Sequence, residues 1–224
     1  MVVELFTSEG CSSCPPADQL LSQLEKSQPL AGIEIIALGE HVDYWNDLGW
    51  PDRFATRAFT ARQQEYGRKL VLESVYTPQM VVNGQAEFSG GDAGRAQREI
   101  KKAAEGPKAR VDVRLLGGDM VKLNVESLPQ GTREAEVLLA VTETNLETNV
   151  QRGENHGRLL RHASVVRSLT SLAKIDTRKS GAYTAEVKVG IAPEWRRENV
   201  SVVVFVQDRS SGKIVGAARV GSGL

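Results

Sequence analysis

Two cysteines three residues apart, Cys11 and Cys14, are the only cysteines among the 224 residues of this chain. They follow a short apolar segment, residues 2–6, and precede a segment of helical periodicity that begins at Pro15. At the first turn of a helix, unpaired backbone N–H groups and the positive end of the dipole stabilise a thiolate, the reactive form of cysteine. Cysteines at this spacing can also form a disulfide with little rearrangement. The pair therefore suits reversible two-electron thiol–disulfide chemistry.

A polar and aromatic loop follows a second apolar segment, residues 33–38, and carries His41, Asp43 and Trp45. In open α/β sheets, sites collect at the carboxyl ends of parallel strands. We therefore expect this loop to lie beside Cys11, with its aromatic side chains forming a substrate wall and His41 or Asp43 polarising the thiol. The alternative is a loop that only packs its aromatic side chains onto the following helix.

The histidines raise the question of a metal or a second catalytic site. His156 and His162 have no serine or cysteine beside them in the sequence, so we expect them to be structural, at a domain interface. Structural zinc needs four ligands, whereas the chain offers two thiols and three scattered histidines. Two thiolates, with or without His41 as a third ligand, could instead hold Cu(I), which makes a copper carrier the main rival to a redox protein.

Charge and hydropathy exclude several classes of protein. Lys plus Arg and Asp plus Glu number 28 each, so the formal net charge is zero. No net field therefore favours nucleic acid or an anionic lipid surface. The longest purely aliphatic or aromatic run, residues 202–206, is too short to span a bilayer. We expect no nucleic-acid partner and no membrane-spanning segment.

Alternating strand and helix signals fill the first hundred residues and would position the cysteine pair. Turn signals at Asn83-Gly84, a helix-capping Asp92 and a stop at Gly106-Pro107 mark the boundaries between the elements. The right-handed crossover rule places the first two strands side by side and parallel. The expected strands are residues 2–6, 33–38, 79–82 and a return strand through residue 88, and the expected helices are residues 16–26, 52–70 and 93–104.

Beyond residue 106 the hydrophobic period changes to two. Six or seven alternating segments, separated by turn residues, are typical of an antiparallel sandwich of the immunoglobulin-like type. Only residues 159–175 are ambiguous between strand and helix. The alternating segments are residues 111–115, 121–125, 137–141, 183–189, 200–206 and 214–220.

The first half of the chain resembles a thioredoxin fold. A strand, a CxxC motif at a helix start, and a later Thr77-Pro78 before a strand and hairpin occur in the thioredoxin order. The resemblance covers residues 1–106. In that superfamily the proline preceding the third core strand has a cis peptide bond and faces the cysteines, and Pro78 is the matching position. The resemblance also implies that Cys11 is the exposed, attacking thiol and that Cys14 is the resolving one.

Thioredoxins often carry a buried acid on the first strand that helps to deprotonate the resolving thiol. Glu4 stands at that place, one residue further from Cys11 than is usual. A buried carboxylate that faced the cysteine pair could relay a proton. The alternative is an exposed glutamate at the end of the strand.

A second resemblance covers nearly the whole chain and is to a family of bacterial secreted, thioredoxin-like proteins of unknown function. It implies an exported protein whose leader preceded Met1. A cytoplasmic protein is the alternative, because the first predicted strand leaves no room for a leader in this chain. The segments that carry the likeness are VELFTSEGCSSCPPAD at residues 3–18, HVDYW at 41–45, YTPQ at 76–79, and residues 153–167, which include His162.

The sequence thus predicts an α/β thioredoxin-like domain, residues 1–106, followed by an all-β immunoglobulin-like sandwich, residues 107–224. The predicted function is thiol–disulfide exchange with a protein or a small thiol or disulfide substrate. Such a reaction needs a redox partner protein but no bound cofactor, and the sandwich is expected to bind the partner or shield the site. A Cu(I) chaperone and a binding protein with a permanent disulfide remain as alternatives. The predicted catalytic residues are Cys11, Cys14, Pro78 and Glu4, and the predicted substrate-contacting residues are Thr77, His41, Asp43 and Trp45.

Overall fold

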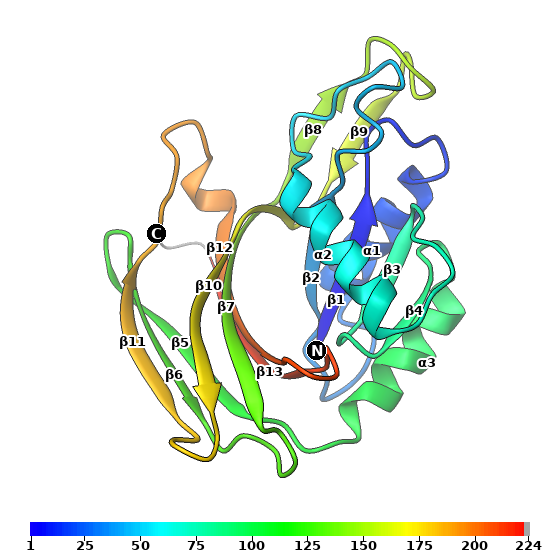
Figure 1. Ribbon diagram of the computed structural model, residues 1–224. Coiled ribbons are helices and arrows are strands. Elements are labelled where there is room, and N and C mark those ends of the chain that lie inside the picture. The colour runs from blue at the N-terminus through cyan, green and yellow to red at the C-terminus, as the bar shows by residue number, and fades with distance from the viewer. Residues whose placement is uncertain (222–224) are drawn as a thin grey trace. The chain divides into compact units, whose positions relative to one another are not determined.

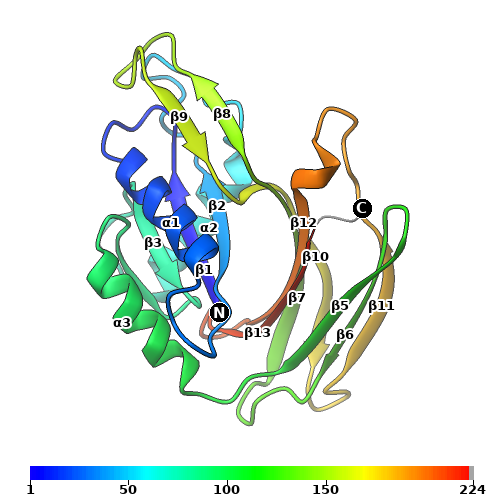
Figure 2. The same ribbon diagram turned by 180° about the vertical axis from the view of Figure 1, so that it is seen from behind.

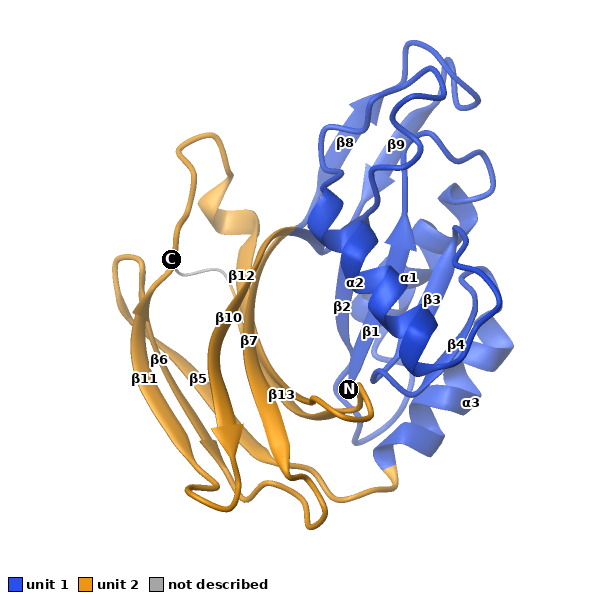
Figure 3. Cartoon of the chain, viewed as in Figure 1, with its two compact units in different colours: residues 1–104, 144–166 blue, residues 105–143, 167–224 orange. Residues whose placement is uncertain are grey.

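The computed structural model describes residues 1–221, and these form two compact units. Unit 1 comprises residues 1–104 and 144–166, and unit 2 comprises residues 105–143 and the residues from 167 onward (Figure 3). The predicted boundary after residue 106 lies close to the first crossing between the units. The prediction of a continuous second domain is wrong, however, because residues 144–166 return to unit 1.

Unit 1 is a mixed sheet covered by helices on both faces. Its main sheet has the order β2-β1-β3-β4; β1 and β2 are parallel, and β3 is antiparallel to both β1 and β4. Within the described residues, no helix is long and apolar enough to cross a membrane. The elements are β1 (Val2–Thr7), α1 (Pro15–Ser27), β2 (Ile36–His41), α2 (Arg57–Lys69), β3 (Gln79–Val82), β4 (Ala86–Ser89), α3 (Ala93–Ala104), β8 (Leu146–Asn149) and β9 (Leu159–His162).

Alternation along β1 determines which helix each of its side chains meets. Val3 and Leu5 belong to an apolar core shared with α1 and α3, whereas Phe6 packs with Tyr66 of α2. Successive side chains of a strand point to opposite faces of its sheet. Figure 1 accordingly shows α2 in front of the sheet, and Figure 2 shows α1 and α3 in front from the other side. The buried aliphatic residues on both faces hold the sheet between two helical layers.

The helix boundaries follow from their terminal residues. Pro15 and Pro16 open α1, where the missing N–H groups would in any case be unpaired. The second helix begins at Arg57, because the side chain of Thr56 accepts a hydrogen bond from the backbone N–H of Ala58. The prediction that this helix starts at residue 52 is therefore wrong.

Residues 144–166 form a β-hairpin and then rejoin the main sheet. Strands β8 and β9 pair antiparallel, and Val165, the first residue of β10 (Val165–Asp176), pairs parallel with Gly39 of β2. A Cβ on Gly39 would lie 3.3 Å from the carbonyl oxygen of Ala163, so glycine suits this close approach. The segment that the sequence left ambiguous, residues 159–175, forms strand β9 and most of strand β10, with a bend at residues 163–164 between them.

Unit 2 consists of strands arranged in two layers. One layer has the order β11-β6-β5, and the other contains β13-β12-β7-β10. Alternate aliphatic side chains from both layers fill one core, which includes Leu123, Leu139 and Val204. The predicted alternating segments are all strands. The elements are β5 (Arg110–Gly117), β6 (Met120–Glu126), β7 (Glu134–Glu143), β11 (Tyr183–Lys188), a 3-10 turn (Arg197–Asn199), β12 (Val200–Asp208) and β13 (Ile214–Val220).

Candidate functional site

The two cysteines form a disulfide at the start of α1. Cys11 and Cys14 are bonded to each other, and Cys14 immediately precedes the helix. The carbonyl oxygen of Cys14 accepts hydrogen bonds from the backbone N–H groups of Ala17 and Asp18. The first helical turn therefore begins directly at the second sulfur-bearing residue, as the sequence predicted.

Pro78 and Trp45 lie close to the disulfide-bearing segment. The Thr77–Pro78 peptide bond is cis, which confirms that prediction. The indole Nε1 of Trp45 donates a hydrogen bond of 2.8 Å to the Thr77 hydroxyl. A Cβ on Gly10, which precedes Cys11, would lie 3.2 Å from Cβ of Trp45. Trp45 thus joins the segment before the first cysteine to the residue before Pro78.

Gly90 shows how tightly Pro78, α1 and β1 are packed. A Cβ on Gly90 would lie 2.7 Å from Cδ1 of Leu5, 2.9 Å from Cβ of Ala17 and 3.2 Å from Cβ of Pro78. We expect Gly90→Ala to lower the free energy of unfolding by about 1–3 kcal/mol, because the added methyl overpacks this core. Chemical denaturation measures the change.

Gly91→Ala is the matched control for that prediction. A Cβ on Gly91 meets no atom within 4 Å, and its backbone does not have the positive φ that disfavours alanine. The two variants should therefore differ in stability, although they change neighbouring glycines in the same way. Equal stability of the two variants would contradict the packing described here.

A loop of the inserted hairpin covers the disulfide. The covering loop, residues 150–158, is closed by backbone hydrogen bonds between Val150 and residues 157 and 158. The Asn155 side-chain amide donates to the carbonyl oxygens of Glu9 and Cys11, each at 2.9 Å. Both cysteines are fully buried. The expectation that Cys11 is exposed is therefore wrong for this conformation.

A tryptophan and a carboxylate anchor the covering loop. Nε1 of Trp50 donates a hydrogen bond of 2.8 Å to the Glu9 carboxylate. A Cβ on Gly153 would lie 3.1 Å from Cβ of Trp50, so the loop packs directly against this tryptophan. At the loop's tip the Glu154 carboxylate accepts a hydrogen bond of 3.2 Å from the backbone N–H of Ser12, between the cysteines.

Buried acids and imidazoles gather beside the covered disulfide. Nδ1 of His41 lies 2.6 Å from Oδ2 of Asp52, and the same oxygen accepts a hydrogen bond from the backbone N–H of Glu9. Burial disfavours the charged imidazole, but the neighbouring Asp52 outweighs it and raises the pKa of His41. Burial likewise opposes ionisation of Asp52, but His41 prevails and lowers the pKa of Asp52. The two residues therefore form a buried ion pair.

Asp18, on α1, and His162, on β9, extend this buried cluster. The ring of His162 is 5.0 Å from that of His41, between centroids, and Nε2 of His162 lies 3.2 Å from Oε1 of Glu9. Burial raises the pKa of Asp18, although His162 and His41 act to lower it. Sequence reasoning missed Asp18 and Glu9 and assigned His162 elsewhere. The sequence did contain a signal for Asp18, which is its position in the predicted helix. Asp18 follows Cys14 by one helical turn and therefore lies on the same side of the helix.

The Asp43 side chain is turned toward α2, so the structure does not support the predicted role of Asp43 in polarising the thiol. Its backbone N–H and its carboxylate are both hydrogen-bonded to the Thr60 hydroxyl, and the neighbouring Tyr44 hydroxyl donates to Gln63. The loop therefore divides. Asp43 and Tyr44 pack on the following helix, whereas His41 and Trp45 are directed toward the cysteine-bearing segment. His156 is exposed in the covering loop.

Glu4 belongs to a separate buried network on the α2 face. Its carboxylate accepts hydrogen bonds from Nε of Arg62, at 2.7 Å, and from the Tyr66 hydroxyl, at 2.6 Å. Glu4 is fully buried, so an exposed strand-end glutamate is ruled out. Because α1 packs on the opposite face of β1, the structure does not support a proton relay from Glu4 to the cysteines.

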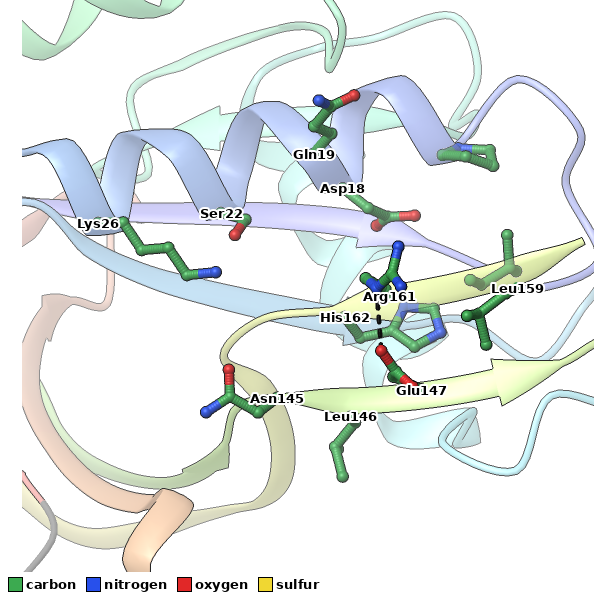
Figure 4. A pocket seen from close by; sticks show the side chains of 12 residues that line it. Asp18, Gln19, Ser22, Lys26, Asn145, Leu146, Glu147, Leu159, Arg161 and His162 are labelled. Carbon is green, nitrogen blue, oxygen red and sulfur yellow. Dashed lines mark hydrogen bonds and ion pairs between the residues drawn. The ribbon is translucent and has the colours of Figure 1, made fainter.

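A pocket of about 530 Å³ lies between α1 and the β8–β9 hairpin, within unit 1. Figure 4 shows Asp18, Ser22 and Lys26 along the side of α1 that faces the hairpin, with Arg161 and Glu147 paired across it. The pocket starts at Pro15, directly after the second cysteine. Its lining residues are Pro15, Asp18, Gln19, Ser22, Lys26, Asn145, Leu146, Glu147, Leu159, Leu160, Arg161 and His162.

A family model described as "Protein of unknown function (DUF1223)" matches residues 2–207. This chain belongs to that family. The match spans both units, including the cysteine pair, the cis-proline segment and the inserted hairpin. No curated protein matches the chain.

One solved structure resembles this chain over nearly its full length. It is a structural-genomics protein from Agrobacterium tumefaciens, determined by X-ray crystallography. The two are 29% identical with a TM-score of 0.78, and the alignment covers 99% of this chain and 94% of the other. A domain of the outer membrane lipoprotein Omp28 from Porphyromonas gingivalis is 16% identical, covers 51% of this chain and 88% of its own, and has a TM-score of 0.29.

The site of this DUF1223 protein therefore combines a covered disulfide, a cis prolyl bond and a buried group of proton-binding side chains. Among residues 1–221, no set of three or more His, Cys, Asp and Glu side chains is arranged to hold a metal ion. His41, the extra ligand considered for Cu(I), has its Nδ1 bound to Asp52 instead. The chemistry that these residues can supply is exchange at sulfur beside side chains that can bind or release a proton.

Proposed function

We propose that this protein is a thiol–disulfide oxidoreductase that acts through Cys11 and Cys14, with unit 1 a thioredoxin-like domain and unit 2 an immunoglobulin-like sandwich. The carrying observation is the disulfide at the N-terminus of α1, in the unit that also holds the cis Thr77–Pro78 bond. A helix N-terminus stabilises the thiolate that appears when this disulfide is opened.

The proposed exchange has two steps at sulfur. A substrate thiolate attacks one sulfur of the pair, the Cys11–Cys14 bond breaks, and a mixed disulfide with Cys11 forms while Cys14 leaves as thiolate. A second substrate thiolate then displaces Cys11, so that the substrate gains a disulfide and the pair gains two electrons. A redox partner protein must reoxidise the pair. Running in reverse, the same steps reduce a substrate disulfide.

The buried cluster beside the disulfide supports this proposal. Opening a buried disulfide produces a thiolate that water cannot stabilise, so a nearby group must supply a proton. Asp18 lies one helical turn after Cys14, and burial raises the pKa of its carboxyl, which favours transfer of a proton through this side chain. Glu4 is not part of this cluster.

A permanent structural disulfide is the second candidate, favoured by the complete burial of both cysteines. In that case the protein binds a partner and does not take part in thiol–disulfide exchange. Exchange requires the covering loop to move away from the cysteines, whereas a structural role requires it to stay closed. Either function is consistent with an oxidising, extracytoplasmic compartment, where disulfides persist.

Equilibration in glutathione or dithiothreitol buffers distinguishes these two candidates. We expect a reduction potential between about −120 and −270 mV, the range of exchange proteins, rather than below about −300 mV, which is typical of structural disulfides. We also expect Cys11→Ser to abolish reduction of insulin disulfides and Cys14→Ser to accumulate a mixed disulfide. Ser12→Ala, a change in an exposed side chain between the cysteines, should retain activity. A potential below the stated range, with no turnover, would refute the proposed exchange.

A further inference from the structure

The pocket beside α1 has features of a built ligand site. Its volume of about 530 Å³ falls within the range of roughly 300–1,000 Å³ that is common for small-molecule sites. One wall is α1, from Pro15 to Lys26, and the other is the β8–β9 hairpin (Figure 4). Leucines 146, 159 and 160 give the hairpin wall an apolar component, so the pocket combines apolar surface with a few polar groups.

A buried imidazole in the lining lacks hydrogen bonds. His162 is 5% exposed, yet neither of its ring nitrogens makes a hydrogen bond in the described part of the chain. Nε2 does lie 3.2 Å from Oε1 of Glu9, but not in hydrogen-bonding geometry. Buried polar groups in proteins are almost always hydrogen-bonded, and an exception calls for an explanation. The ring of His162 lines the pocket beside Asp18, although its two nitrogen atoms are themselves buried.

The charges on the α1 wall are separated. Asp18 lies near the start of the helix and Lys26 near its end, two turns away on the same side. Eight residues of α-helix correspond to about 12 Å. Within residues 1–221, Lys26 makes no ion pair, and its side chain is exposed. The opposite wall adds no net charge, because Arg161 and Glu147 neutralise each other at 2.9 Å.

We propose that this pocket binds a short peptide with free termini. Its ammonium group would lie at Asp18, beside the ring of His162, and its carboxylate at Lys26. An extended chain advances about 3.3–3.6 Å per residue, so a span of about 12 Å corresponds to three or four residues. A ligand of this kind carries both charges at the required separation, whereas a simple anion or cation would leave one end of the wall unmatched. The inference does not depend on redox activity of the disulfide.

Calorimetric titration of the full chain with tetra-alanine tests the proposal. We expect saturable binding of tetra-alanine and binding weaker by about tenfold or more for the N-acetylated or the C-amidated peptide, since each loses a charged contact. Asp18→Asn should weaken tetra-alanine binding but remove the sensitivity to N-acetylation. Lys26→Gln should likewise remove the sensitivity to C-amidation. These double-mutant cycles assign each end of the peptide to one side chain.

The controls use charges outside the pocket. Asp47→Asn and Lys101→Gln change exposed residues that do not line it, and both should bind tetra-alanine as the wild type does. Lys26 is exposed, so its variant remains informative even if Asp18→Asn does not fold. Absence of binding by the wild type at millimolar peptide, or equal binding of the doubly blocked peptide, would overturn the proposal.

Discussion

Replacing Arg62 by methionine should lower the free energy of unfolding by about 3–5 kcal/mol, the range found when one partner of a buried ion pair is removed. The guanidinium is within 2.6 Å of Oε1 of Glu4 and 3.4 Å of Oε1 of Glu40. Both carboxylates are fully buried. Without Arg62, the Glu4 carboxylate would remain in the core without its cationic partner and would keep the hydrogen bond from the Tyr66 hydroxyl.

Glu40 differs from Glu4 in its titration. Burial and the neighbouring Glu4 raise the pKa of Glu40 well above the usual range. A carboxyl whose folded pKa is raised favours the folded state at low pH. The folded state loses that advantage as the pH rises from the pKa of this carboxyl in the unfolded chain toward its pKa in the folded protein. Glu40→Gln mimics the protonated acid, so this variant should lose less stability than Arg62→Met and should lack this part of the pH dependence.

Denaturant titration at several pH values measures both effects. Arg68→Met is the matched control, since Arg68 is an exposed residue of the same helix and should change stability by less than about 0.5 kcal/mol. If Arg62→Met were as stable as Arg68→Met, the buried network would not contribute to the fold as described.

Asn155→Ala should accelerate reduction of the disulfide. This side chain alone links the covering loop to the carbonyl oxygens of Glu9 and Cys11. Two hydrogen bonds together contribute about 1–3 kcal/mol. If the disulfide reacts only when the loop is open, their loss should raise the rate of reduction by dithiothreitol about 5- to 150-fold.

The rate should be followed with dithiothreitol in excess, under conditions in which the folded state persists. His156→Ala is the control, because His156 is exposed in the same loop and its side chain does not contact the cysteine segment in any hydrogen bond described here. A rate for Asn155→Ala equal to that of the wild type would mean that the loop does not limit access to the disulfide.

Local signals were sufficient for much of unit 1. The CxxC motif, the prolines after it and Thr77-Pro78 each depend on neighbouring residues, and the structure places the helix start and the cis bond where the sequence predicted them. The apolar alternation in residues 111–125 likewise identified strands of unit 2, because period two reflects the pleat of a single strand.

Contacts between residues far apart in the sequence could not be predicted from such local signals. Asn155 follows Cys11 by 144 residues, and nothing near Asn155 in the sequence indicates that its amide covers a disulfide. Glu4 illustrates a different limit. Its neighbours Val3 and Leu5 are also buried, so the residue types of this two-sided buried strand do not reveal which face carries α1.

The return of residues 144–166 to unit 1 also has a consequence for synthesis. The cysteines leave the ribosome early, whereas Asn155 emerges only after residues 105–143 have been made. Until then, Cys11 and Cys14 of the nascent chain lack the covering loop and can react with an oxidant. A disulfide that forms before residues 150–158 are in place therefore forms without the covering loop, and the loop then restricts access to it.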